Sequence, residues 1–165
     1  MIVKENKADP IDTSFDKIYD ATGKYYTEIR TGNILEPEKT YVVILDVDII
    51  EGKAMNFEAG VSREVGLAMV KSIPSFTDTN FNKSGRYTYV VNITEEDLTY
   101  GGEVLETPYF AFRIRNNMEK IIFKINEFIF YDGDSPADAY IPPLTNIENN
   151  TFAVREGYYK DTISI

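Results

Sequence analysis

Hydrophobic and polar residues alternate with a period of two along much of the chain. Within residues 40–50, one parity is apolar and the other carries two aspartates: Tyr41, Val43, Leu45, Val47 and Ile49 against Asp46 and Asp48. This alternation is typical of a β-strand with one buried face and one solvated face. The pattern therefore predicts a long strand that packs against a core.

The same period returns in later segments. Apolar side chains occupy alternate positions in residues 54–61, 67–73, 86–94 and 109–115, most weakly in the second of these. In residues 120–131 the apolar positions change parity, with Ile121, Phe123 and Ile125 before the change and Phe128 and Phe130 after it. The change predicts a β-bulge near Asn126 and Glu127.

Turn-forming residues separate these segments. Residues 50–53 are expected to form a hairpin turn, and residues 74–85 a long polar loop. Thr94 precedes Asp97 by three residues, a spacing that favours the cap of a single helical turn. No segment of ten or more residues shows the helical period. Strands joined by turns therefore account for the whole patterned region.

Seven or eight strands without helices predict an all-β domain, and we expect a jelly-roll β-sandwich of two antiparallel sheets with about eight strands. A chain of 165 residues fits one domain. We place that domain at residues 1–143, where two prolines close the patterned region. Residues 144–165 are expected to be a C-terminal tail, a linker or a strand exchanged with a neighbouring copy in a homo-oligomer.

Missing residue types restrict the chemistry of the chain. There is no Cys and no His, which excludes disulfides, Ser-His and Cys-His catalysis, and the usual zinc sites. The formal net charge of −10 repels phosphate backbones and anionic lipids, so we expect neither nucleic-acid nor membrane binding. The first seven residues lack the apolar region of a signal peptide. We expect a non-enzymatic protein made in the cytoplasm.

Two segments are similar to the pattern of a known family. Residues 32–41, Gly-Asn-Ile-Leu-Glu-Pro-Glu-Lys-Thr-Tyr, precede the long strand, and residues 121–134 are followed by Ala-Asp-Ala-Tyr-Ile-Pro-Pro at 137–143. On these motifs, residues 24–143 resemble the carbohydrate-binding-module-like (galactose-binding-like) jelly rolls of tail and baseplate proteins of phages that infect Gram-positive bacteria. The chain departs from many such domains in having no Trp.

The resemblance implies a non-catalytic component of a phage or prophage virion. Such a component would be a tail or baseplate accessory, or a host-recognition module that binds cell-wall saccharides. Two alternatives stay open: a purely structural decoration or assembly protein whose partners are other virion proteins, and a carbohydrate-binding module of a cell-wall-active protein. A glycoside hydrolase would need two carboxyl groups in a cleft. Asp46 and Asp48 lie on an exposed strand face and are better explained by solubility.

Sugar recognition requires flat apolar rings together with donors and acceptors for hydroxyl groups. Five residues of two predicted strands offer these groups on polar faces: Tyr109, Arg113 and Arg115 on one strand, Asn56 and Glu58 on the other. If both strands belong to one sheet, the five residues form a shallow ligand-binding surface. The alternative is a solvated outer face on which the arginines pair with surplus carboxylates.

An acidic turn follows the last long strand. Asp132 and Asp134 flank Gly133 and resemble a calcium-binding turn, because Ca²⁺ prefers several oxygen ligands from a flexible loop. A structural calcium is the one cofactor that the sequence indicates. Asp-Gly is also a common hairpin turn, and the regular spacing of a dedicated calcium loop is missing. Both interpretations of this turn stay open.

Overall fold

The computed structural model of the protein describes residues 3–11, 17–136 and 139–141. Two four-stranded antiparallel sheets dominate these residues. The β10 sheet has the order β3-β10-β5-β6, with β3 Tyr26–Ile34, β10 Tyr109–Arg115, β5 Asn56–Ser62 and β6 Lys71–Ser72. The β11 sheet has the order β2-β11-β4-β7, with β2 Ile18–Asp20, β11 Ile121–Asp132, β4 Lys39–Gly52 and β7 Gly85–Ile93.

Smaller elements decorate the two sheets. Strands β1 Val3–Glu5 and β12 Ala139–Ile141 pair in parallel, and β8 Thr99–Tyr100 forms a hairpin with β9 Glu103–Val104. Two short 3-10 turns complete the elements of the described residues, η1 Pro74–Phe76 and η2 Glu96–Leu98. Within the described residues, no helix has the length and apolar character that crossing a membrane requires.

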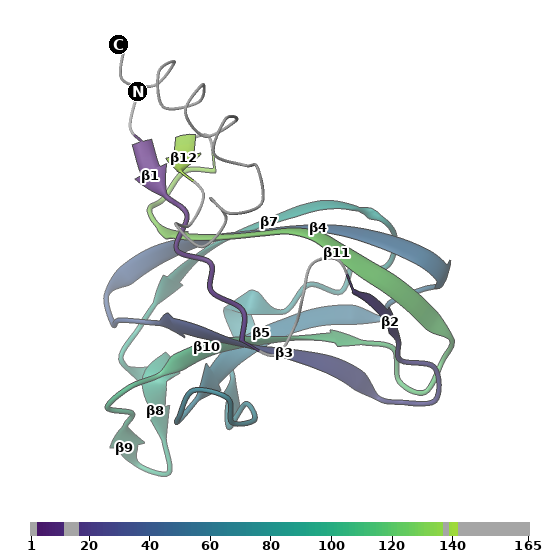
Figure 1. The fold of residues 1–165 in the computed structure, drawn as a ribbon. Helices are drawn as coiled ribbons and strands as arrows, with labels where there is room; N and C mark the ends of the chain where they lie inside the picture. Colours follow the sequence, from purple (N-terminus) through teal and green to yellow (C-terminus); the bar gives the residue numbers. More distant parts are fainter. Residues whose placement is uncertain (1–2, 12–16, 137–138, 142–165) are drawn as a thin grey trace.

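The order of strands is that of a jelly roll, so the predicted fold class is confirmed. The chain passes from β3 in one sheet to β4 in the other and back to β5, and later from β7 to β10 and on to β11. Figure 1 shows the two sheets stacked as layers, with β4, β7 and β11 above and β3, β5 and β10 below. The eight strands of the two sheets match the expected number.

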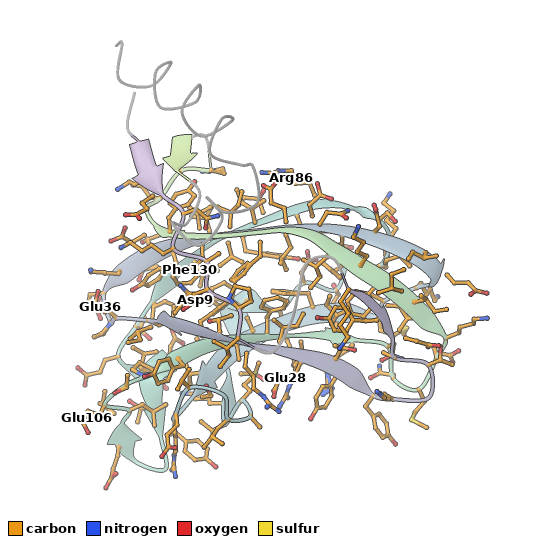
Figure 2. The ribbon with its side chains drawn as sticks, viewed as in Figure 1. Asp9, Glu28, Glu36, Arg86, Glu106 and Phe130 are labelled. Atoms are coloured by element: carbon orange, nitrogen blue, oxygen red, sulfur yellow. The ribbon has the colours of Figure 1, made fainter. Side chains whose placement is uncertain are left out.

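Phenylalanine side chains fill the space between the layers. Phe110 and Phe112 point inward from β10, and Phe128 and Phe130 point inward from β11, with ring centroids 5.3 to 6.2 Å apart across the layers. Figure 2 shows Phe130 between the two sheets. Each of the four side chains is almost fully buried. Burial of one such ring stabilises the fold by about 1.5–3 kcal/mol.

The predicted bulge in β11 is confirmed and explains how both halves of the strand reach the core. The pairing of β11 with β4 shifts between Ile125 and Glu127, which leaves Asn126 as an extra residue. Phe123 and Ile125 before the shift and Phe128 and Phe130 after it are all buried. The cap predicted for one helical turn is also confirmed: Asp97 N–H donates to Thr94 Oγ1 and Thr94 N–H donates to Asp97 Oδ2.

Two local predictions were wrong. Residues 50–53 do not form a hairpin within one sheet, because β4 continues to Gly52 beside β11 and the chain then crosses to β5 in the other sheet. The strand predicted for residues 67–73 is limited to the two residues of β6. The loop predicted for residues 74–85 is confirmed apart from the 3-10 turn η1, and two fully buried rings, Phe76 and Phe81, anchor it to the core.

The N-terminal segment closes one side of the sandwich. Asn6 binds the edge of β11: Phe130 N–H donates to Asn6 Oδ1 at 3.0 Å, and Lys7 N–H donates to Phe130 O at 2.7 Å. A few residues later, Gly32 N–H of β3 donates to Asp9 O, and Asn33 accepts from Asp9 N–H and donates to Lys7 O. This segment therefore joins the edges of both sheets.

Tyr89 gives the fold a dependence on alkaline pH. Its ring stacks on Phe57 at 4.6 Å, and its hydroxyl donates to Asp78 Oδ2 at 3.0 Å. Burial, together with the nearby Asp78 carboxylate, raises the pKa of Tyr89 well above its usual value of 10.0. A folded-state pKa above the unfolded value contributes stability that is complete below pH 10 and is lost as the pH rises above it.

Above pH 10, we expect Tyr89 to lower the free energy of unfolding by up to about 1.4 kcal/mol for each pH unit. The free energy of unfolding of Tyr89→Phe should therefore fall less steeply with pH than that of wild type. Urea denaturation between pH 8 and 11 measures both slopes. Tyr25→Phe, at an exposed tyrosine, is the control and should keep the wild-type slope. Identical slopes in wild type and Tyr89→Phe would contradict the assignment.

Candidate functional site

The outer face of the β10 sheet brings together all five residues that the sequence singled out for ligand binding. Strands β10 and β5 are neighbours, and their register places Arg113 opposite Glu58 and Arg115 opposite Asn56. Tyr109 lies opposite Ser62 at the other end of the pair. Because Phe110, Phe112 and Ile114 point into the core, these side chains point away from it. The predicted common face is therefore present.

A row of ion pairs crosses this face. Arg113 lies between two glutamates: its Nε is 2.8 Å from Glu28 Oε1 of β3, and its Nη1 is 3.3 Å from Glu58 Oε1 of β5. Arg115 Nε is 3.2 Å from the same Glu58 oxygen. Figure 2 shows Glu28 on the outer side of the lower sheet. The arginines are thus paired with carboxylates, as the alternative interpretation of this face expected.

The side chains of this row are less exposed to solvent than those on an ordinary outer sheet face. The side chain of Glu28 is 6% exposed and that of Arg113 is 16% exposed. The connection between β5 and β6 contributes to this cover, since Met69 N–H donates to Glu28 Oε1 and Arg30 Nη1 donates to Gly66 O. The Tyr26 ring lies 4.4 Å from the Arg113 guanidinium carbon, within cation–π range.

The electrostatics of the row favour the charged form of Arg113. Burial alone would lower the pKa of this guanidinium, but the hydrogen bond and the charge of Glu28 outweigh burial and raise that pKa above its usual value. A sugar hydroxyl that bound Arg113 would have to displace a carboxylate. Sequence reasoning missed Glu28, although its alternation with Arg30 on the polar parity of residues 26–34 is a readable signal. A binding role for the five predicted residues stays a prediction.

A second candidate site is a cleft at one end of the sandwich, which we call the hairpin cleft. It has a volume of about 550 Å³ and lies between the β5–β6 connection and the β8–β9 hairpin. Its lining residues are Arg63, Glu64, Tyr100, Glu103, Val104, Leu105, Glu106 and Thr107. Figure 2 labels Glu106 at this end of the molecule. Sequence reasoning missed the cleft because its two segments are far apart in the chain.

Local chemistry explains how the hairpin is held in place. Gly101 and Gly102 both have positive φ angles, 64° and 83°, which a two-residue turn between twisted strands requires. Lys71 of β6 fixes the base of the hairpin, because its Nζ donates to Glu96 O at 2.5 Å and to Thr99 O at 2.9 Å. The hairpin thereby presents Tyr100 toward the β5–β6 connection.

The hairpin cleft combines one aromatic ring with several polar groups. The guanidinium carbon of Arg63 lies over the Tyr100 ring, 4.9 Å from its centroid. Glu64, Glu103 and Glu106 supply carboxylate acceptors, and Thr107 supplies a hydroxyl. A ring beside acceptors and one cation can bind a polar ligand that also has an apolar face. Three carboxylates against one guanidinium give the cleft a net negative charge.

The acidic turn predicted to bind calcium lies elsewhere, at the end of β11. It forms part of a shallow pocket of about 330 Å³ lined by Lys4, Lys39, Thr40, Asp132, Gly133 and Asp134. Asp132 Oδ1 is 3.7 Å from Lys7 Nζ, and Asp132 Oδ2 is 3.8 Å from Lys39 Nζ. Within the described ranges, no group of three or more potential metal ligands lies together. Calcium binding by Asp132 and Asp134 stays a prediction.

Comparison with known proteins adds no family to this description. No protein-family model matches the chain, and no curated protein matches it significantly. The similarity of residues 24–143 to tail and baseplate jelly rolls therefore remains an expectation from sequence motifs.

Removal of Arg113 should destabilise the protein. We expect Arg113→Ala to lower the free energy of unfolding by about 2–3 kcal/mol, because it leaves Glu28 and Glu58 covered and unpaired. Arg86→Ala is the matched control: Arg86 contacts Asp46 and Glu127 on the other sheet, but its side chain is 45% exposed. Its loss should cost less than about 1 kcal/mol. Equal losses of unfolding free energy for the two variants in urea denaturation would contradict this prediction. They would show that the row of ion pairs stabilises the protein no more than exposed surface pairs do.

Proposed function

We propose that this protein is a non-catalytic saccharide-binding module that holds its ligand in the hairpin cleft. The observation that carries the proposal is the position of Tyr100 and Arg63 beside three glutamates in an open cleft. A tyrosine ring offers an apolar surface to the C–H face of a sugar, and carboxylates accept hydrogen bonds from its hydroxyls. The open shape suits a unit within a longer polysaccharide.

The charge of the cleft narrows the class of saccharide. Glu64, Glu103 and Glu106 face the ligand with Arg63 as the single counter-charge among the lining residues. An anionic sugar or a phosphate-linked polymer would be repelled both by this cleft and by the net charge of −10. Neutral sugars and sugars with a free amino group fit better. A cell-wall polysaccharide that contains hexosamine is the ligand that this chemistry favours.

The exposure of the cleft supports binding without turnover. Hydrolysis of a glycosidic bond needs a general acid that is kept protonated by a desolvating environment. Glu64, Glu103 and Glu106 are all exposed to solvent. The cleft therefore offers acceptors for hydrogen bonds but no enclosed acid. A chain without His or Cys also offers none of the usual nucleophile and base pairs.

The setting that we propose for this module is a phage or prophage virion, as a tail or baseplate accessory that takes part in host recognition. Support comes from the motifs of residues 24–143 and from the jelly-roll order of the strands, which agrees with the fold that those motifs imply. Saccharides of the host cell wall and other virion proteins would be the partners.

Binding to purified cell-wall polysaccharides, measured by calorimetry or on a glycan array, tests the proposal. We expect a dissociation constant of about 1 mM or lower for wild type and at least a tenfold weaker value for Tyr100→Ala, because the stacking surface is lost. Tyr25→Ala removes an exposed tyrosine outside the cleft and should bind like wild type.

Two results would contradict saccharide binding in the hairpin cleft. Loss of binding in Arg113→Gln with normal binding in Tyr100→Ala would move the ligand to the outer face of the β10 sheet. Absence of binding to every wall polysaccharide, together with a stable complex with a virion protein, would favour the purely structural alternative.

A further inference from the structure

The β11 sheet ends at β7 in a strand edge that is open. Strand β7 is the last strand in the order β2-β11-β4-β7, so only one of its two sides is paired (Figure 1). Its nine residues run beside β4 without a shift of register. Proteins usually protect such an edge with a lysine, a proline or a bulge. Strand β7 has none of these, and its one charged residue is Arg86, close to its start.

Two hydrogen bonds show which backbone groups of β7 point away from β4. Glu38 N–H donates to Ile93 O, so the backbone groups of Ile93 face β4. Gly133 N–H donates to Thr40 O, which turns Thr40 toward β11 and the next residue of β4 toward β7, in agreement with that direction. Because backbone groups alternate along a strand, every second residue of β7 faces the open edge. These edge residues are Arg86, Thr88, Val90 and Asn92.

The backbone of the edge residues is open to a further strand. Within residues 3–11, 17–136 and 139–141, no group forms a hydrogen bond with the N–H or C=O that these four residues turn outward. The side chains of Thr88, Val90 and Asn92 are exposed and uncharged, and that of Val90 is 44% exposed. A strand added here would form backbone hydrogen bonds along the whole of β7 and cover Val90.

The charges around β7 favour a second copy of the chain as the source of that strand. Residues 79–94 contain no Asp or Glu, although the net charge of the chain is −10, so repulsion between two copies is weakest here. The exposed Lys83 precedes β7 and the exposed Glu95 follows it, each six positions from Tyr89. Two antiparallel copies of β7 centred on Tyr89 therefore place Lys83 of each copy beside Glu95 of the other. Opposite charges in such positions attract.

We propose that β7 pairs with β7 of a second copy of this chain, antiparallel and about a two-fold axis at Tyr89. The pair joins two β11 sheets of four strands into one continuous sheet. In this register Arg86 lies opposite Asn92 and Thr88 opposite Val90, so every edge residue of both strands forms backbone hydrogen bonds. The inference is independent of the proposed saccharide binding, because the hairpin cleft contains no residue of β7.

Sedimentation velocity of the full chain between about 1 and about 200 μM tests this pairing. We expect wild type to form dimers within this range. Val90→Pro removes an outward N–H and keeps the bonds to β4, so dimerisation should weaken about tenfold, because the two-fold axis removes the bond twice. Val90→Thr keeps the N–H and is the matched control, which should dimerise like wild type. A monomeric wild type, or undiminished dimerisation of Val90→Pro, would overturn the proposal.

A second measurement leaves the backbone of β7 intact and so does not depend on the folding of Val90→Pro. Lys83→Glu places like charges side by side and should weaken dimerisation several-fold, whereas Lys83→Glu combined with Glu95→Lys should restore it. Lys24→Glu, at the exposed turn between β2 and β3, changes the net charge equally and should dimerise like wild type. Equal dimerisation of Lys83→Glu and Lys24→Glu, or no recovery in the combined variant, would also overturn the proposal.

Discussion

The facing phenylalanines of β10 and β11 are the contact on which the rest of this molecule depends. Each of these strands has neighbours on both sides within its own sheet, and together they place Phe110, Phe112, Phe128 and Phe130 between the layers. Because side chains alternate across a strand, this choice of inward residues also decides which residues point outward. The arginines of β10 occupy their positions for that reason. So does a second buried apolar cluster on the outer face of the β11 sheet, which we call the outer cluster and which consists of Val42, Ile44, Ile129 and Tyr131. The side chains on the two outer faces are therefore those at the positions that the core does not use.

The outer faces of the two sheets carry different kinds of side-chain contact. On the β10 sheet, Glu28, Arg113 and Glu58 form a row across three strands, in which each hydrogen bond has a direction and fixes the register of its neighbours. Such a row adds little net stability but is costly to break, since a covered charge without a partner is unfavourable. On the β11 sheet, the outer cluster has no directional bonds between its aliphatic members. Its stability therefore comes from the exclusion of water and not from directional bonds.

Sequence patterns predicted the parts of this structure that depend on alternation within one strand. The bounds of β10, the bulge at Asn126 and the cap formed by Thr94 and Asp97 all follow from neighbours in the chain. Patterns failed where distant segments decide the outcome. Val42 and Ile44 read as part of a continuous apolar run, and their outward burial depends on cover from outside β4 and β11. Phe76 and Phe81 lie in a stretch too polar to suggest a core, and the hairpin cleft joins residues that are some forty positions apart.

The clasp formed by residues 6–11 makes the two sides of the sandwich unequal. It occupies the edges of β3 and β11, so within the described part of the chain the longest strand edge left without a partner strand is that of β7. Unpaired strand edges are where β-proteins can pair with strands of other chains. A molecule with such edges on both sides could add further molecules at each edge without limit. On the side opposite β7, β2 and the first half of β3 are the edges that have no partner strand among the described residues. By occupying part of these edges, residues 6–11 reduce the strand edge that is available for pairing with other chains.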